Sequence, residues 1–214
     1  MAKAVKRRYD NTRRLAQVRA TRLSVIEAAK GLFIEHGYPA TTLESVADTA
    51  DVALPTLYRL FKSKRGLLSA VLENSFVGDD KPIAFADRPE VQAARSEPDP
   101  SKLLNAFAGI AKAFMDRSSG ILHALATAAQ VDAEAADLLA EIRRQRHTGQ
   151  SRIVAALVER DELDPSLDPS EAADFVYLLL SPDAHRILTV ERGWTPEQYQ
   201  AWLARALCRT LLAR

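Results

Sequence analysis

The run "LPTLYRLFKSK" at residues 54–64 combines side chains that suit a polyanion with side chains that suit apolar atoms. Tyr58, Arg59 and Lys64 can donate hydrogen bonds to phosphates or to base edges. Leu54 and Pro55 share a helix face with Tyr58 and Arg59, whereas Leu57, Leu60 and Phe61 point to the opposite side. The floor of the DNA major groove offers thymine methyl groups beside polar base edges, so this mixture suits the reading of bases.

Helical signals on both sides would position this run. Apolar residues recur at intervals of three, four and seven over residues 13–35, and Gly37 is typical of a left-handed helix end. A second helix is expected within 41–50, where Thr41 and Glu44 have the spacing of a capping box. The run itself predicts a third helix, and Ser63 predicts the cap of a fourth. Two short helices joined by a tight turn, with a supporting helix before them, predict a helix-turn-helix.

The charges divide along the chain, although the net charge of all 214 residues is only +1. Residues 1–72 carry a net charge of +7 and the remaining residues carry −6. A basic head on an acidic body is typical of a polyanion-binding module joined to something else, and a solvated charged face is the alternative. The first residues, "KAVKRRYDNTRRLAQVRATR", hold one acid. We expect Arg7 and Arg8 to probe a minor groove, unless the arm is a frayed, solvated tail.

The stretch "TTLESVADTADVALPTLYRLFKSKRGLLSAV" resembles the DNA-binding signature of TetR-family repressors over residues 22–73. The resemblance implies a major-groove helix and a division of roles. Phosphates would be contacted by Thr41, Thr42, Thr56, Tyr58 and Lys64, and base edges by Leu54, Pro55 and Arg59. The chain departs from the family pattern at Asp51, where many relatives have Gly, and at Ala53, where a Ser usually caps the helix.

The rest of the chain reads as further helices. Residues 78–100 contain four prolines and many acids, which predicts a loop, either ordered or disordered. Helical periodicity returns over 101–117, 119–130, 133–162, 169–180, 183–192 and 196–213, and no segment reads as a strand. We therefore predict an all-α fold with two domains. Residues 1–72 would form the basic arm and a three-helix, helix-turn-helix head, and residues 73–214 a helical bundle for ligand binding and dimerisation.

A weaker resemblance continues near the C-terminus, in "LDPSEAADFVYLLLSPDAHRILTVERGWTPEQYQAWLARAL", and implies a homodimer built from the final helices. Its candidate interface residues are Tyr199, Trp202, Leu203 and Leu207, which lie on an apolar stripe that could also complete the monomer core. The candidates for an effector cavity are Phe107, Phe114, His123, Phe175 and Tyr177, with plain core packing as the alternative. The stretch "RRQRHTGQSR" at 143–152 predicts either a polar cavity wall or an exposed seam, and we favour the seam.

Other classes of protein fit less well. The four histidines lie far apart, and no zinc spacing, phosphate loop or nucleophile elbow is present, which argues against an all-helical enzyme, a metal site or a cofactor. A sequence-nonspecific DNA-coating protein would explain the basic head but not the acidic body. No apolar run reaches the length that spans a bilayer. The sequence thus predicts a cytoplasmic, ligand-responsive regulator, a homodimeric repressor that a small-molecule effector releases from a double-stranded DNA operator.

Overall fold

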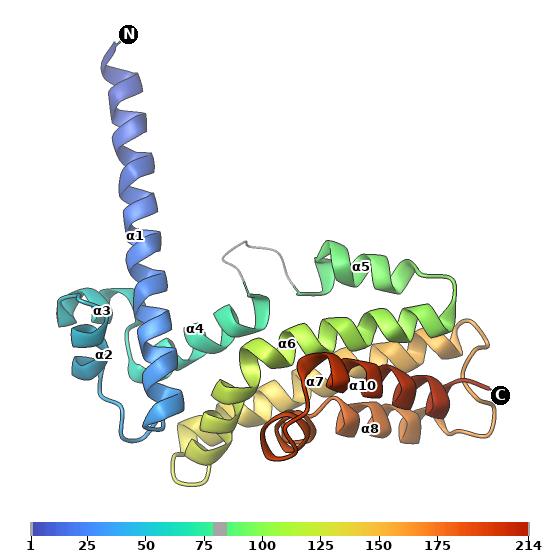
Figure 1. Cartoon of the computed structure of the whole chain (residues 1–214). Helices are drawn as coiled ribbons and strands as arrows, with labels where there is room; N and C mark the ends of the chain where they lie inside the picture. The colour runs from blue at the N-terminus through green and yellow to red at the C-terminus, as the bar shows by residue number, and fades with distance from the viewer. Residues whose placement is uncertain (1, 79–84, 214) are drawn as a thin grey trace. The chain divides into compact units, whose positions relative to one another are not determined.

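A computed structural model of the chain describes residues 2–78 and 85–213, without the side chains of residues 2–11 and Ala86. All named elements in these ranges are helical, and the β-structure there is confined to one isolated bridge between Leu163 and Leu212 (Figure 1). The predicted all-α class is confirmed. The chain forms two compact units, Met1–Asn74 and Ser75–Arg214, which we call unit 1 and unit 2.

Unit 1 contains α1 (Ala2–Glu35), α2 (Leu43–Thr49), α3 (Leu54–Phe61) and most of α4 (Lys64–Val77). The C-terminal half of α1 supplies buried apolar side chains to its core, whereas residues 12–20 of α1 are exposed. The guanidinium of Arg22 lies 4.8 Å from the centre of the Phe61 ring and ties α1 to α3. The buried residues of this core are Val25, Ile26, Ala29, Phe33, Leu43, Val46, Ala47, Leu57, Phe61, Leu67, Leu68, Val71 and Leu72.

Backbone turns set the limits of the short helices. Gly37 and Asp51 have positive φ angles of 81° and 53°, so the left-handed helix end and the tolerated Asp in the turn are both confirmed. Ser63 caps α4, because its Oγ accepts a hydrogen bond from the amide of Gly66 at 3.0 Å. The predicted capping box between Thr41 and Glu44 is wrong. Thr42 is the N-cap of α2 and Ser45 is its partner, one residue further along the chain.

Unit 2 is a helical bundle. It contains η1 (Phe85–Asp87), α5 (Pro89–Ser96), α6 (Pro100–Ala128), α7 (Ala133–Val158), α8 (Pro169–Leu179), α9 (Pro182–Arg186), the π-turn η2 (Ile187–Glu191) and α10 (Pro196–Leu211). Figure 1 shows α10 running along α6, and α8 packs against α7. Four of these helices begin with a side-chain cap followed by proline, a pairing that favours a helix start: Asp99, Asp168, Ser181 and Thr195.

Three predicted boundaries in this unit are wrong. The expected loop over 78–100 contains η1 and α5, and α5 is held by the buried side chains of Val91 and Ala94; residues 79–84 lie outside the described residues. The helices expected over 101–117 and 119–130 are one helix, because Ser118 satisfies its hydroxyl within the helix by donating to the carbonyl of Phe114 at 2.7 Å. The helix expected over 183–192 is α9 followed by η2.

Candidate nucleic-acid interface and effector cavity

The outer face of α3 is the candidate surface for DNA. Leu57 and Phe61 are buried and anchor the helix on unit 1. On its other side Pro55 and Arg59 are exposed, Tyr58 is 45% exposed and Leu54 is half-buried. The structure therefore brings these predicted base-reading and phosphate-contacting residues together on one accessible helix face. The size of this face, one short helix, suits insertion into a major groove.

The start of α3 lacks a side-chain cap, as the alanine at position 53 implied. The carbonyl of Ala53 accepts from the amides of Thr56 at 2.8 Å and Leu57 at 3.4 Å. Pro55 has no amide hydrogen, so the first turn has no donor to satisfy at that position. Thr56 is half-buried in the same turn.

The two threonines before α2 differ in their surroundings. Thr42 is exposed and its hydroxyl accepts from the amide of Ser45 at 3.1 Å. Thr41 is buried, and its hydroxyl lies 3.2 Å from the carbonyl oxygen of Leu32 and 2.9 Å from that of Gly37, to which it donates. The prediction that Thr41 contacts DNA is therefore wrong, because its side chain is enclosed and holds the turn between α1 and α2.

Lys64 is half-buried and is already engaged within unit 1. Its ammonium donates to the carbonyl of Pro39 at 3.2 Å and lies 4.4 Å from the centre of the Tyr38 ring. These contacts fix the start of α4, and a phosphate contact by Lys64 stays a prediction. Lys62 and Arg65, on either side of it, are exposed cations that sequence reasoning missed. The run "FKSKR" holds all three, and the family resemblance pointed only to the middle one.

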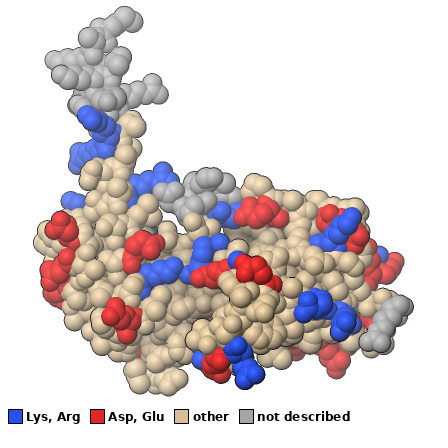
Figure 2. Space-filling view, in the orientation of Figure 1, with Lys and Arg blue, Asp and Glu red and all other residues tan. Residues whose placement is uncertain are grey.

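The basic arm continues α1 as a helix. Arg7 and Arg8 lie within α1, but their side chains lie outside the described residues, so their predicted groove contact stays a prediction. Arg13, Arg14 and Arg19 are exposed, and Figure 2 shows basic side chains gathered on the described part of this helix. An exposed helix that carries several cations is well suited to phosphate contact.

Unit 2 encloses a cavity of about 260 Å³ between the end of α4, η1, α5, α6 and α7. Phe107 and Phe114 lie in its lining, as predicted, together with Phe76 and Phe85. The other three cavity candidates do not line it. His123 is exposed on α6, Phe175 packs against the core, and Tyr177 stacks on the guanidinium of Arg146. Aromatic spacing alone did not separate lining from core residues.

The stretch 143–152 of α7 is largely exposed, as expected for the seam that we favour, and it also supplies polar groups to the lining of this cavity. Gln145, Arg146, Gly149, Gln150 and Arg152 line the cavity. Arg146 donates from Nη2 to the carbonyl of Leu180 at 3.2 Å, and burial lowers its pKa. Two buried atoms, Arg146 Nε and Gln150 Oε1, have no hydrogen-bond partner within the described part of the chain.

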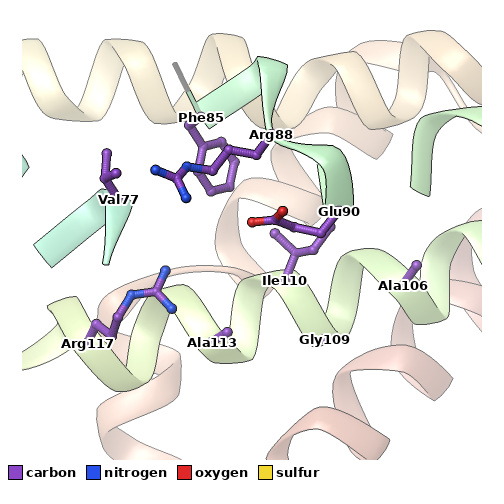
Figure 3. Close-up of a pocket in the computed structure, with 9 residues that line it drawn as sticks. All are labelled: Val77, Phe85, Arg88, Glu90, Ala106, Gly109, Ile110, Ala113 and Arg117. Carbon is purple, nitrogen blue, oxygen red and sulfur yellow. The ribbon is translucent and has the colours of Figure 1, made fainter. Parts of the chain in front are cut away.

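A second cavity of about 360 Å³ adjoins the first, since Phe85 and Ile110 line both. Figure 3 shows the charged ends of Arg88, Glu90 and Arg117 directed into this second cavity. Arg117 also donates to the carbonyls at the end of α4, from Nε to Ser75 at 3.4 Å and from Nη2 to Phe76 at 3.3 Å. The second cavity therefore mixes both signs of charge.

The predicted dimer-interface residues lie largely inside one chain. Tyr199, Leu203 and Leu207 are 0% exposed and belong to the core that α10 forms with α6, α7 and α8. Trp202 is partly buried, and its ring centre lies 6.0 Å from that of Trp194. The interface prediction for the three buried side chains is wrong, because a single chain covers them completely. The helical period of the apolar residues predicts that one face of α10 is buried. It does not show whether the same chain or a second chain covers that face.

Buried titratable groups in unit 2 pack with one another. His185 is buried, with Nε2 3.6 Å from Asp116 Oδ1 and its ring edge-on to Tyr199 at 4.8 Å. Burial lowers the pKa of His185, and it raises the pKa of Tyr199 to about 12. These shifts keep both side chains neutral, as expected for groups within a core. No cluster of metal-ligand residues was found in the described ranges. Nor do they contain a helix long and apolar enough to cross a membrane.

The fold and the exposed face of α3 define a helix-turn-helix protein with a helical C-terminal unit. Residues 25–71 match the family model of bacterial regulatory proteins, tetR family. The chain is 30% identical over 200 residues to the HTH-type transcriptional regulator TtgR of Pseudomonas putida, covering 83% of this chain and 89% of that protein. This chain belongs to the TetR family and is a DNA-binding transcriptional regulator. The family consists of regulators, which confirms the prediction that the chain is not an enzyme.

One further relative and one solved structure are also similar to this chain. The HTH-type transcriptional repressor ComR of Escherichia coli is 26% identical over 165 residues, covering 73% of this chain and 74% of that protein. A structure of a SmeT–triclosan complex superposes with a TM-score of 0.70 at 16% identity, covering 91% of this chain and 92% of that one. The second comparison shows the shared fold.

Proposed function

We propose that this protein is a cytoplasmic, homodimeric repressor that binds a two-fold DNA operator and releases it when a small molecule fills the cavity of unit 2. The observation that carries the proposal is the exposed face of α3, where apolar and cationic side chains stand together on a helix anchored from behind. Arg59 and Pro55 are accessible there, and an exposed arginine can pair with guanine through two hydrogen bonds.

Positioning on the duplex would come from groups around this face. Thr56 and Tyr58 carry hydroxyls on α3, Thr42 carries one at the start of α2, and Lys62 and Arg65 add exposed cations after α3. Contacts of this kind to phosphates fix the register of a protein on DNA but carry no sequence information. Leu54, Pro55 and Arg59 would then read the bases.

Dimerisation would place two copies of α3 on half-sites about one helical turn (~34–36 Å) apart. With the α10 stripe buried, we place the interface on α8 and η2, which carry exposed apolar side chains. Leu178 is 65% exposed and Val190 is 72% exposed, and Ile187 is also exposed. Exposed apolar side chains of this size suit a surface that a second copy would cover.

Effector binding is supported by the cavity of unit 2. Its walls are mainly apolar, with a few polar groups from α7, which is the usual make-up of a small-molecule site. The SmeT structure with the same fold was determined with triclosan. A ligand that binds the DNA-free state more tightly than the DNA-bound state shifts the protein away from its operator.

Fluorescence anisotropy with DNA that flanks the protein's own gene tests this proposal. We expect that DNA to bind at least ~10³-fold more tightly than scrambled DNA at the same salt concentration. Equal affinity for both at every salt concentration would favour a sequence-nonspecific coating protein and refute the proposal.

A further inference from the structure

The cavity of unit 2 has an aromatic wall. The rings of Phe76 from α4 and Phe114 from α6 are stacked with their centres 5.1 Å apart, and Phe85 from η1 meets Phe114 edge-on at 6.1 Å. Phe107 adds a fourth ring to the lining. Aromatic rings prefer offset-stacked or edge-to-face contact with other rings, so this wall suits a flat aromatic body.

The polar part of the lining is basic or neutral. It consists of Arg95 from α5 together with Gln145, Arg146, Gln150 and Arg152 from α7, and no Asp or Glu is among the described lining residues. A cationic ligand would lose its hydration here without gaining a carboxylate partner, which is costly. An anionic ligand would instead meet arginine. The charge of the walls therefore selects against cations.

Arg146 is the cation best placed to bind an anion. Its guanidinium is fixed from two sides, by the bond from Nη2 to the Leu180 carbonyl at 3.2 Å and by the ring of Tyr177, whose centre is 4.7 Å away. Its Nε is buried and lacks a hydrogen-bond partner in the described residues, as does Oε1 of Gln150 one turn further along α7. Arg146 lines the cavity, so an oxyanion there would form a charge-assisted contact with its guanidinium.

The neighbouring cavity fits an anion less well. Its two arginines, Arg88 and Arg117, share the space with the carboxylate of Glu90 (Figure 3). Arg117 already donates to the carbonyls of Ser75 and Phe76. The carboxylate of a ligand in this cavity would be repelled by the carboxylate of Glu90.

We propose that the effector is a compact aromatic acid, with its ring system against Phe76, Phe85 and Phe114 and its carboxylate on Arg146. This inference rests on the proposed function, since it names the chemical class of the effector for the same cavity. The cavity volume of about 260 Å³ lies just below the ~300–1,000 Å³ typical of drug-sized sites, which limits the body to small ring systems.

Isothermal titration calorimetry with three matched probes tests the inference. The probes are naphthoate, naphthylmethanol and naphthylmethylammonium, substituted at the same ring position, and the full-length protein is used. We expect naphthoate to bind about tenfold or more tightly than the alcohol, because a hydrogen bond to a charged group is worth that much, and the ammonium to bind most weakly. Because the three affinities are compared on the unaltered protein, this test does not depend on the folding of a variant.

Two variants locate the carboxylate. Arg146→Met is expected to bring the affinity for naphthoate down to that for the alcohol, and Arg146→Lys to restore part of the difference. Arg143→Met is the matched control, since Arg143 is an exposed arginine on α7 outside the lining and should change nothing. Circular dichroism checks that each variant is folded.

Each other result overturns the inference. Equal affinities for the three probes, or a preference for naphthoate that survives in Arg146→Met, would show that Arg146 does not select an acid. Loss of the preference in Arg88→Met instead would place the carboxylate in the second cavity. Tight binding of the alcohol alone would overturn the aromatic acid but leave the effector cavity of the proposed function standing. If no probe binds, the result counts against both the aromatic acid and the effector cavity of the proposed function. DNA binding is measured separately, in the operator titration.

Discussion

Replacement of Gly66 by alanine tests how α3 is joined to α4. A Cβ atom at Gly66 would collide with the carbonyl oxygen of Phe61 and lie 3.3 Å from its carbonyl carbon, so the backbone between the two helices must shift. Overpacking of this kind costs about 1–3 kcal/mol. Alanine returns about 1 kcal/mol through helix propensity. We expect a net loss of up to about 2 kcal/mol in the free energy of unfolding.

Gly31→Ala is the matched control in the same unit. Gly31 lies inside α1 and is exposed, and a Cβ atom added there would meet no neighbouring atom within 4 Å. Alanine at this position should therefore stabilise the protein by about 1 kcal/mol. Urea unfolding followed by circular dichroism measures both variants. Since Gly66 fixes the junction behind α3, Gly66→Ala should also weaken operator binding in an anisotropy titration. A Gly66→Ala protein as stable as the Gly31→Ala protein would refute the reasoning.

Three further predictions concern buried and exposed groups. Thr41→Val should lower the free energy of unfolding by about 1–2 kcal/mol in urea, since valine removes the buried hydroxyl that donates to the Gly37 carbonyl and lies 3.2 Å from that of Leu32; an unchanged midpoint would contradict this. The pKa of His185 is lowered by burial from 6.5, so the unfolded chain binds more protons and stability should fall as the pH drops below about 6.5. His185→Gln should flatten that part of the stability profile, and an unaltered slope would assign the effect to other groups. Replacement of Leu178 and Val190 by aspartate should give monomers in sedimentation while far-UV circular dichroism stays unchanged; an intact dimer would place the interface elsewhere.

Local signals predicted the helices well. The starts of α6, α8, α9 and α10 follow from Asp, Ser or Thr before proline, because these side chains satisfy free amides at the first turn. The amphipathic run at 54–64 likewise predicted α3 and its exposed face. Such features depend on neighbours in the sequence, so the sequence alone determines them.

Tertiary packing decided the features that the sequence did not predict. Thr41 and Thr42 are adjacent and chemically alike, yet only the packing of α1 on α2 encloses the first and exposes the second. Tyr199 lies on an apolar stripe of α10, and nothing in that stripe shows whether α6 or a second chain covers it. From the sequence Arg146 is indistinguishable from a surface cation, and it lines a cavity because α6 and α8 pack against α7.

The central claim is that α3 reads DNA through Leu54, Pro55 and Arg59 while Tyr58 holds phosphate. Competitive anisotropy with the operator and its single-base-pair variants tests it most directly. Arg59→Ala should lose about 1–3 kcal/mol of preference at one base pair, whereas Tyr58→Phe should weaken binding to every sequence alike. If Arg59→Ala weakens all sequences equally and keeps the full preference at each position, α3 does not read the bases in the way proposed.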